Sequence, residues 1–106
     1  MKYAERTLSD VAVWGFAVGF HADTTAVTGS VRLQVTNQDG GDHGPDVTIQ
    51  ISTAVDERNP TIRDAEHALL MSAYELIKRL ATETPETLIE KLESLRPQDN
   101  FFAEKP

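Results

Sequence analysis

The stretch NPTIRDAEHALLMSAYELIKRLA, residues 59–81, decides the fold of this chain. Its apolar residues recur at spacings of three or four, which places them in one continuous stripe along a helix. The members of the stripe are Ile62, Ala65, Leu69, Ala73, Leu76 and Leu80. The spacing predicts a helix over residues 60–81, and a stripe of this length needs a sheet to lie against.

Two alternative sets of residues can start this helix. Asn59 can cap the first turn, with Pro60 at the first helical position, where a missing N–H costs nothing. Thr61 and Asp64, three residues apart, offer an alternative start of the capping-box type. We expect the start at Asn59.

Three predicted strands precede the helix. Residues 25–36 and 46–55 alternate apolar and polar side chains, as antiparallel strands with one buried face do. Residues 11–22 also alternate, but both of their faces are apolar. One face carries Ala12, Trp14, Phe16, Val18 and Phe20, and the other carries Val11, Val13, Gly15, Ala17 and Gly19. The turn-forming loops between these segments predict an antiparallel meander with residues 25–36 in the middle.

A second, shorter helix is predicted to begin with Thr84 as N-cap and Pro85 at the first helical position. The expected fold class is therefore α+β, a two-layer sandwich. A three-stranded antiparallel meander, or a four-stranded one if residues 1–10 add a strand, carries one long and one shorter C-terminal helix packed on one face. We expect a single domain over residues 1–96 and a C-terminal tail over residues 97–106.

Composition narrows the classes of partner. The formal net charge is −7, and no cluster of cations is present that could grip nucleic-acid phosphates. The chain has no cysteine, which excludes disulfides and thiolate metal sites. The apolar run over residues 11–22 is too short to span a bilayer, and the first ten residues lack the apolar core of a signal peptide. We expect a cytoplasmic, acidic protein that binds neither nucleic acid nor membrane.

The predicted strand over residues 11–22 lies at the edge of the meander and is apolar on both faces. Native proteins cover or charge such an edge, because it otherwise pairs with other chains. We expect a second copy of the chain to cover it in a homodimer. The interface candidates are Val11, Val13, Gly15, Ala17 and Gly19. The alternative is a cover within one chain, supplied by the N-terminal arm or by the second helix.

The aromatic face of the same strand is a candidate ligand groove. Trp14, Phe16 and Phe20 could line it, and His21 at the strand end lies next to Asp23 in the sequence. A histidine beside a carboxylate can serve as a general base. However, an aromatic stripe at strand spacing is more often core beneath a helix. No nucleophile elbow, phosphate loop or dinucleotide-binding pattern accompanies it, which favours a protein that is not an enzyme.

The loop NQDGGDHGPD, residues 37–46, contains the weak metal-ligand candidates of the sequence. These are Asp39, Asp42, His43 and Asp46. Carboxylates in a glycine-rich loop can surround a hard divalent cation, but the spacing does not match an EF-hand. A solvated turn is the preferred interpretation, and we expect neither a metal ion nor a cofactor.

Two hypotheses of function remain. The first is a non-enzymatic, acidic protein-interaction or accessory protein, chaperone-like in character, that acts as a homodimer through its first strand and binds a protein partner. The alternative is a small ligand-binding domain or enzyme that uses the aromatic face of that strand together with His21.

Overall fold

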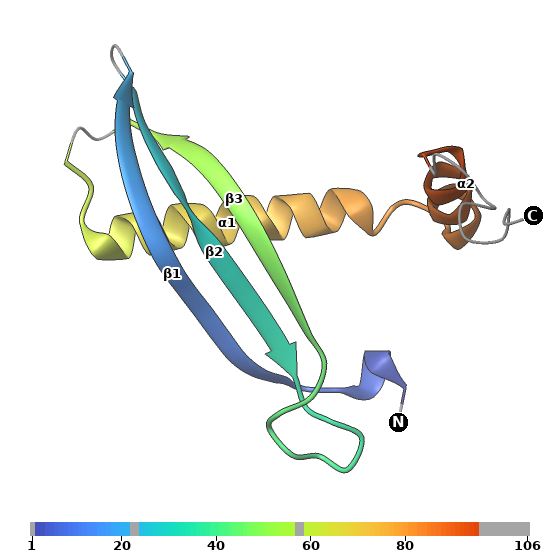
Figure 1. Cartoon of the computed structure of the whole chain (residues 1–106). Coiled ribbons are helices and arrows are strands. Elements are labelled where there is room, and N and C mark those ends of the chain that lie inside the picture. The colour runs from blue at the N-terminus through green and yellow to red at the C-terminus, as the bar shows by residue number, and fades with distance from the viewer. Residues whose placement is uncertain (1, 22–23, 57–58, 96–106) are drawn as a thin grey trace, which may run out of the picture. The chain divides into compact units, whose positions relative to one another are not determined.

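The computed structural model describes residues 2–21, 24–56 and 59–95 of the chain. It is an α+β protein, with a three-stranded antiparallel sheet followed by two C-terminal helices, which confirms the predicted fold class (Figure 1). The elements are the short 3-10 helix η1 (Tyr3–Glu5), the strands β1 (Leu8–His21), β2 (Thr24–Val35) and β3 (Asp46–Val55), and the helices α1 (Ile62–Leu80) and α2 (Pro85–Leu95).

The sheet has the order β1-β2-β3, with β2 in the middle as predicted. Residues 8–10 lengthen β1, where Leu8 pairs with Val35 of β2, so this part of the N-terminal arm does not add a fourth strand. Within the described residues, β1 and β3 therefore each pair with β2 alone and each leave one edge open.

The core lies between the sheet and α1. Val27 and Val31 of β2 are fully buried against Ala65, Leu69 and Ala73 of α1. These three helix residues are the middle of the predicted stripe, whereas Ile62 at the start of α1 is 72% exposed. Partly buried residues from all three strands and from α1 surround this centre: Val13, Leu33, Ile49, Ile51, Val55 and Leu70.

The alternative start of the long helix is the one that the structure adopts. The Thr61 hydroxyl accepts a hydrogen bond from the Asp64 amide at 3.0 Å, and an Asp64 carboxylate oxygen accepts one from the Thr61 amide at 3.3 Å. This reciprocal pair satisfies two amides that the first turn leaves without a helical partner. The expected start at Asn59 is wrong, because α1 begins at Ile62 and Thr61 is the residue whose side chain caps its first turn.

We expect Thr61→Ala to lower the free energy of unfolding by about 1 kcal/mol, because the first-turn amide of Asp64 loses its acceptor. Urea denaturation followed by circular dichroism measures the change. Thr61→Ser keeps the hydroxyl and should retain most of the stability. Equal losses in the two variants would show that the cap hydrogen bond contributes nothing.

A β-bulge interrupts β1 near its middle. Trp14 pairs with Ser30 of β2 and Ala17 pairs with Thr28, so Gly15 and Phe16 together stand opposite a single residue, Gly29. Gly15 has a φ of 75°, in the left-handed region that glycine adopts without steric cost. Because of this extra residue, the even-numbered side chains of residues 10–14 point to one face of the sheet, and those of residues 16–20 point to the other face.

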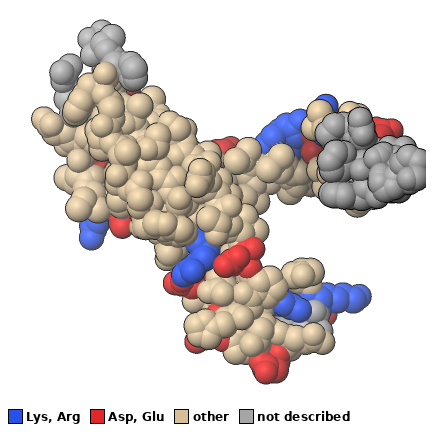
Figure 2. Space-filling model, viewed as in Figure 1, with Lys and Arg blue, Asp and Glu red and all other residues tan. Residues whose placement is uncertain are grey.

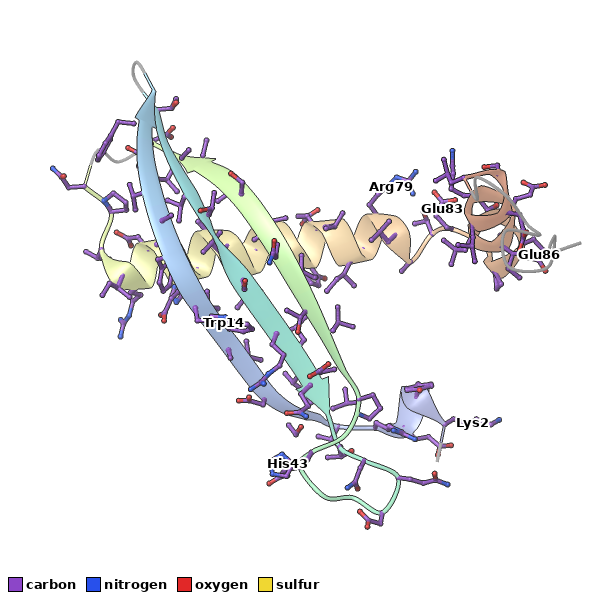
Figure 3. The ribbon with its side chains drawn as sticks, in the orientation of Figure 1. Lys2, Trp14, His43, Arg79, Glu83 and Glu86 are labelled. Carbon is purple, nitrogen blue, oxygen red and sulfur yellow. The ribbon has the colours of Figure 1, made fainter. Side chains whose placement is uncertain are left out.

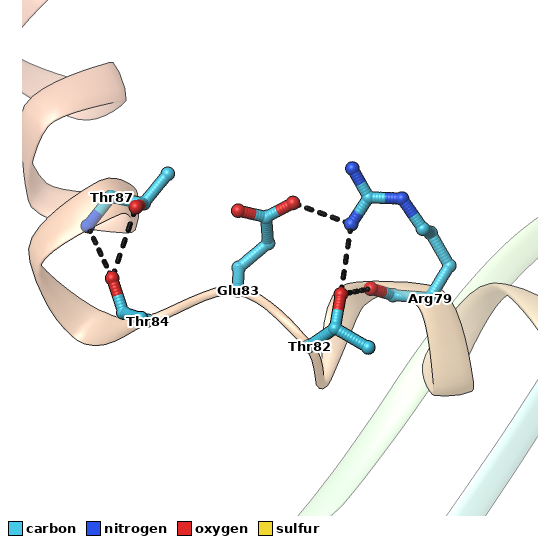
Figure 4. Close-up of polar contacts among 5 residues, drawn as sticks. All are labelled: Arg79, Thr82, Glu83, Thr84 and Thr87. Atoms are coloured by element: carbon cyan, nitrogen blue, oxygen red, sulfur yellow. Dashed lines mark hydrogen bonds and ion pairs between the residues drawn. The ribbon is translucent and has the colours of Figure 1, made fainter.

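Contacts within the chain divide it into two compact units, of which the first ends at Leu76 and the second begins at Ile77. In the second unit the Thr84 hydroxyl accepts a hydrogen bond from the Thr87 amide at 3.1 Å, which confirms the predicted cap of α2 (Figure 4). Arg79 forms an ion pair with Glu83 and contacts the Thr82 hydroxyl at 3.2 Å. A single domain over residues 1–96 stays a prediction, and the proposed tail lies outside the described residues.

No helix among the described residues is long and apolar enough to cross a membrane.

Candidate functional site

The edge strand β1 exposes a row of large apolar side chains. Trp14 is 44% exposed, Val18 is 48% exposed, and Phe16 and Phe20 are also exposed. Trp14 and Phe16 are therefore not the buried core residues that an aromatic stripe at strand spacing most often provides. Large apolar side chains exposed along one edge strand make that strand a candidate binding surface, because a folded protein gains no stability from leaving them in water.

The bulge divides the predicted aromatic face between the two sides of the sheet. Val18 pairs with the buried Val27, so Val18 lies on the side that carries α1, and alternation places Phe16 and Phe20 with it. Trp14 pairs with Ser30, which precedes the buried Val31 and therefore points to the other side. Trp14 and Phe20 thus do not line one groove, because the extra residue at the bulge reverses the alternation between them.

The predicted interface residues are divided in the same way. Val13 pairs with Val31 and packs on the core, and Val11 lies on the same side, partly exposed. Ala17 and Gly19 come after the bulge and lie on the face away from α1. Gly15 forms the bulge itself. An interface through β1 would therefore use its open edge and both of its sides, rather than one face of small residues.

The face of the sheet away from α1, which we call the outer face, contains a hollow at the bulge. Ser30 and Gln50, a cross-strand pair, line one side of it, and the pair Thr28 and Ser52 lines the other. Trp14 and Ala17 of β1 pair with Ser30 and Thr28 and lie just outside this lining. Between them lie Gly15, Gly29 and Ile51, whose backbone forms the floor, because the Ile51 side chain packs toward α1. The hollow has a volume of about 410 Å³ and opens to solvent.

The lining of the hollow is neutral. Its polar side chains are the hydroxyls of Thr28, Ser30 and Ser52 and the amide of Gln50. The cation on the outer face of β2 is Arg32, which lies beyond the hollow and forms an ion pair with Asp10 of β1 at 2.9 Å. Figure 2 shows this side of the sheet, and uncharged residues cover most of it. The alternation in residues 25–36 and 46–55 identifies the outer face as polar and nearly uncharged. The hollow could not be predicted in this way, because it lies at the bulge of β1.

The loop that holds the metal-ligand candidates is organised by its own hydrogen bonds. The Asn37 side-chain oxygen accepts hydrogen bonds from the Gly41 amide at 2.7 Å and the Asp39 amide at 3.1 Å. The Asp42 carbonyl accepts one from the Ser9 hydroxyl at 2.9 Å. The candidates Asp39, Asp42, His43 and Asp46 do not come together: across residues 2–21, 24–56 and 59–95, no three histidine or acidic side chains form a group that could hold a metal ion.

His43 is exposed in this loop, away from Trp14 (Figure 3). His21 is the last residue of β1 and pairs with Thr24. The His21 side chain and Asp23 lie outside the described part of the chain, so their proposed pairing stays a prediction.

Compared with models of protein families, with curated proteins and with solved structures, the chain matches none of them.

Proposed function

We propose that this chain is a non-enzymatic, acidic interaction protein of the cytoplasm, with a chaperone-like accessory role, that acts as a homodimer through β1. The observation that carries the proposal is the open edge of β1. This strand has 14 residues, exposes apolar side chains along most of its length and contains neither lysine nor proline. The cytoplasmic location carries over from the sequence-based expectation.

The edge of β1 has the features that favour pairing with another strand. Proteins protect sheet edges with lysine, proline, inward-pointing charges or bulges. β1 contains neither lysine nor proline, and its bulge at Gly15 leaves a regular segment of edge on either side. The acidic side chain of β1, Asp10, is compensated by its ion pair with Arg32. An added strand would satisfy the outward N–H and C=O groups of β1 and bury part of its apolar row.

A second copy of the chain is the natural occupant of this edge. Antiparallel pairing of β1 with β1 is self-complementary, so one two-fold axis joins two sheets into one and leaves no open β1 edge. Within the described residues, the N-terminal arm adds no strand to this edge. Its Thr7 carbonyl accepts a hydrogen bond from the Thr36 amide at 2.8 Å, which directs this part of the arm toward the chain following β2.

We expect Val18→Lys to weaken the dimer at least tenfold, because it places a charge among the apolar side chains of the pairing edge. The dissociation constant is measured by analytical ultracentrifugation and checked by native mass spectrometry. Val47→Lys is the matched control. Val47 also lies on an edge strand, β3, and at 52% exposed it resembles Val18 at 48%.

The proposal fails if the unmodified protein is a monomer across the micromolar range, which would indicate a cover within one chain. It also fails if the two variants weaken the dimer equally, because the interface would then not be specific to β1.

A further inference from the structure

We infer that the hollow on the outer face, beside Trp14, is a binding site for a neutral saccharide. The hollow extends over β1, β2 and β3, whereas the homodimer is proposed at the edge of β1, so sugar binding and dimerisation are measured separately.

The shape of the hollow suits a flat ring. Its floor is the backbone of Gly15, Gly29 and Ile51, which presents no side chain upward. Its two borders are rows of short side chains on neighbouring strands, and the bulge widens the space between them on β1. A volume of about 410 Å³ lies within the range of small-molecule sites, and one or two sugar rings would fill it.

The chemistry of the borders selects a neutral ligand with many hydrogen-bonding groups. The Gln50 amide offers both donors and acceptors. The hydroxyls of Ser30 and Ser52 do the same, and the Thr28 hydroxyl, whose contact to the Ala17 carbonyl is long at 3.5 Å, keeps its lone pairs. An apolar ligand would cover these groups without pairing them, which is costly.

Charged ligands fit this site poorly. A phosphate or carboxylate would need a cation, and Arg32 on the outer face is already paired with Asp10. Nucleic acid is disfavoured for the same reason and by the net charge of −7. An extended peptide pairs with the edge of a sheet, where backbone groups are open, whereas this hollow lies on the face.

Trp14 supplies the platform that a sugar ring requires. It lies at the margin of the hollow, next to Gly15 in the chain and opposite Ser30 on β2, and its side chain is 44% exposed on the outer face. An indole is large, rigid and apolar over its plane, with one N–H at its edge. The apolar C–H face of a pyranose can pack on that plane while its hydroxyls reach the serine, threonine and glutamine side chains.

Trp14 is the single tryptophan of the chain and adjoins Gly15 of the hollow, so a change in its emission reports a ligand that packs on it. We expect a saturable change in Trp14 emission on titration with at least one of three neutral trisaccharides: cellotriose, maltotriose and triacetylchitotriose. Gln50→Leu should weaken that binding about tenfold, the effect of losing a hydrogen bond of about 1.4 kcal/mol. Gln38→Leu is the matched control, because Gln38 is exposed in the loop after β2, outside the hollow, and should leave the affinity unchanged.

Trp14→Ala removes the platform, and calorimetric titration should then detect no binding, while circular dichroism and ultracentrifugation report the fold and the dimer separately. The inference is overturned if none of the three sugars changes Trp14 emission. It is also overturned if a sugar binds equally well to Gln50→Leu, Trp14→Ala and the unmodified protein.

Discussion

Leu69→Ala should lower the free energy of unfolding by about 2–5 kcal/mol, the cost of deleting a buried leucine and leaving a cavity. Leu69 is fully buried at the centre of α1, against Val27 and Val31. Among the described residues only five apolar side chains are buried, so the core is small and each member carries a large share of the stability. Urea denaturation at a fixed protein concentration measures the loss, and an unchanged m-value would show that the native surface stays comparable.

Met71→Ala is the matched control for this prediction. Met71 lies on the same helix, two residues from Leu69, but is 55% exposed. Its truncation should change the free energy of unfolding by no more than about 0.5 kcal/mol. Equal losses in the two variants would contradict the packing of α1 on the sheet through Leu69.

The order and type of the elements were predictable from the sequence because each long element carries its own period. The alternation of Val27, Val31 and Leu33 assigns the buried face of β2, and the spacing of Ala65, Leu69 and Ala73 assigns that of α1. The apolar residues recur at these spacings because they are the buried ones, so the same pattern predicts both the elements and the core between them. The helix start was less predictable, since Asn59 and Thr61 are both residues that cap helices and only the hydrogen bonds decide between them.

Simple alternation did not predict that the aromatic side chains of β1 lie on opposite faces of the sheet before and after the bulge. Counting alternate residues through Gly15 placed Trp14 with Phe20 on one face, whereas one additional residue at the bulge places them on opposite faces. A glycine inside a strand pattern is a recognised sign of a bulge, so the signal was present. The exact position of the bulge was not predictable, because the identity of the extra residue depends on how β1 pairs with β2.

The candidate site was predictable in part for the same reason. Thr28, Ser30, Gln50 and Ser52 follow from alternation as one polar, nearly uncharged surface. Their arrangement around a hollow does not, since it requires the register of three strands and the bulge on the first of them. The edge position of β1 was predicted from the meander, and the exposure of its aromatic side chains required the structure.

Gly29→Ala should lower the free energy of unfolding by about 1–3 kcal/mol, the usual range for overfilling a packed core. A Cβ at this position would lie 2.8 Å from Cδ1 of Leu69 and 3.2 Å from the carbonyl oxygen of Trp14. The absence of a side chain therefore allows α1 to approach β2 at the centre of the core. Gly19→Ala is the control, because a Cβ on Gly19 meets no atom within 4 Å, and it should be neutral or slightly stabilising.

Combining the two core substitutions gives the sharpest test of this packing. Leu69→Ala removes the Cδ1 atom that a Cβ on residue 29 would meet, so Gly29→Ala should cost less in that background than alone. The double-mutant cycle should show a coupling of about 1 kcal/mol, whereas independent sites add to within about 0.5 kcal/mol. Additive losses would mean that α1 does not contact the sheet at Gly29. A coupling confined to this pair, and absent between Leu69→Ala and Gly19→Ala, would place a direct contact between α1 and the sheet at Gly29. The backbone of this residue also forms part of the floor of the hollow.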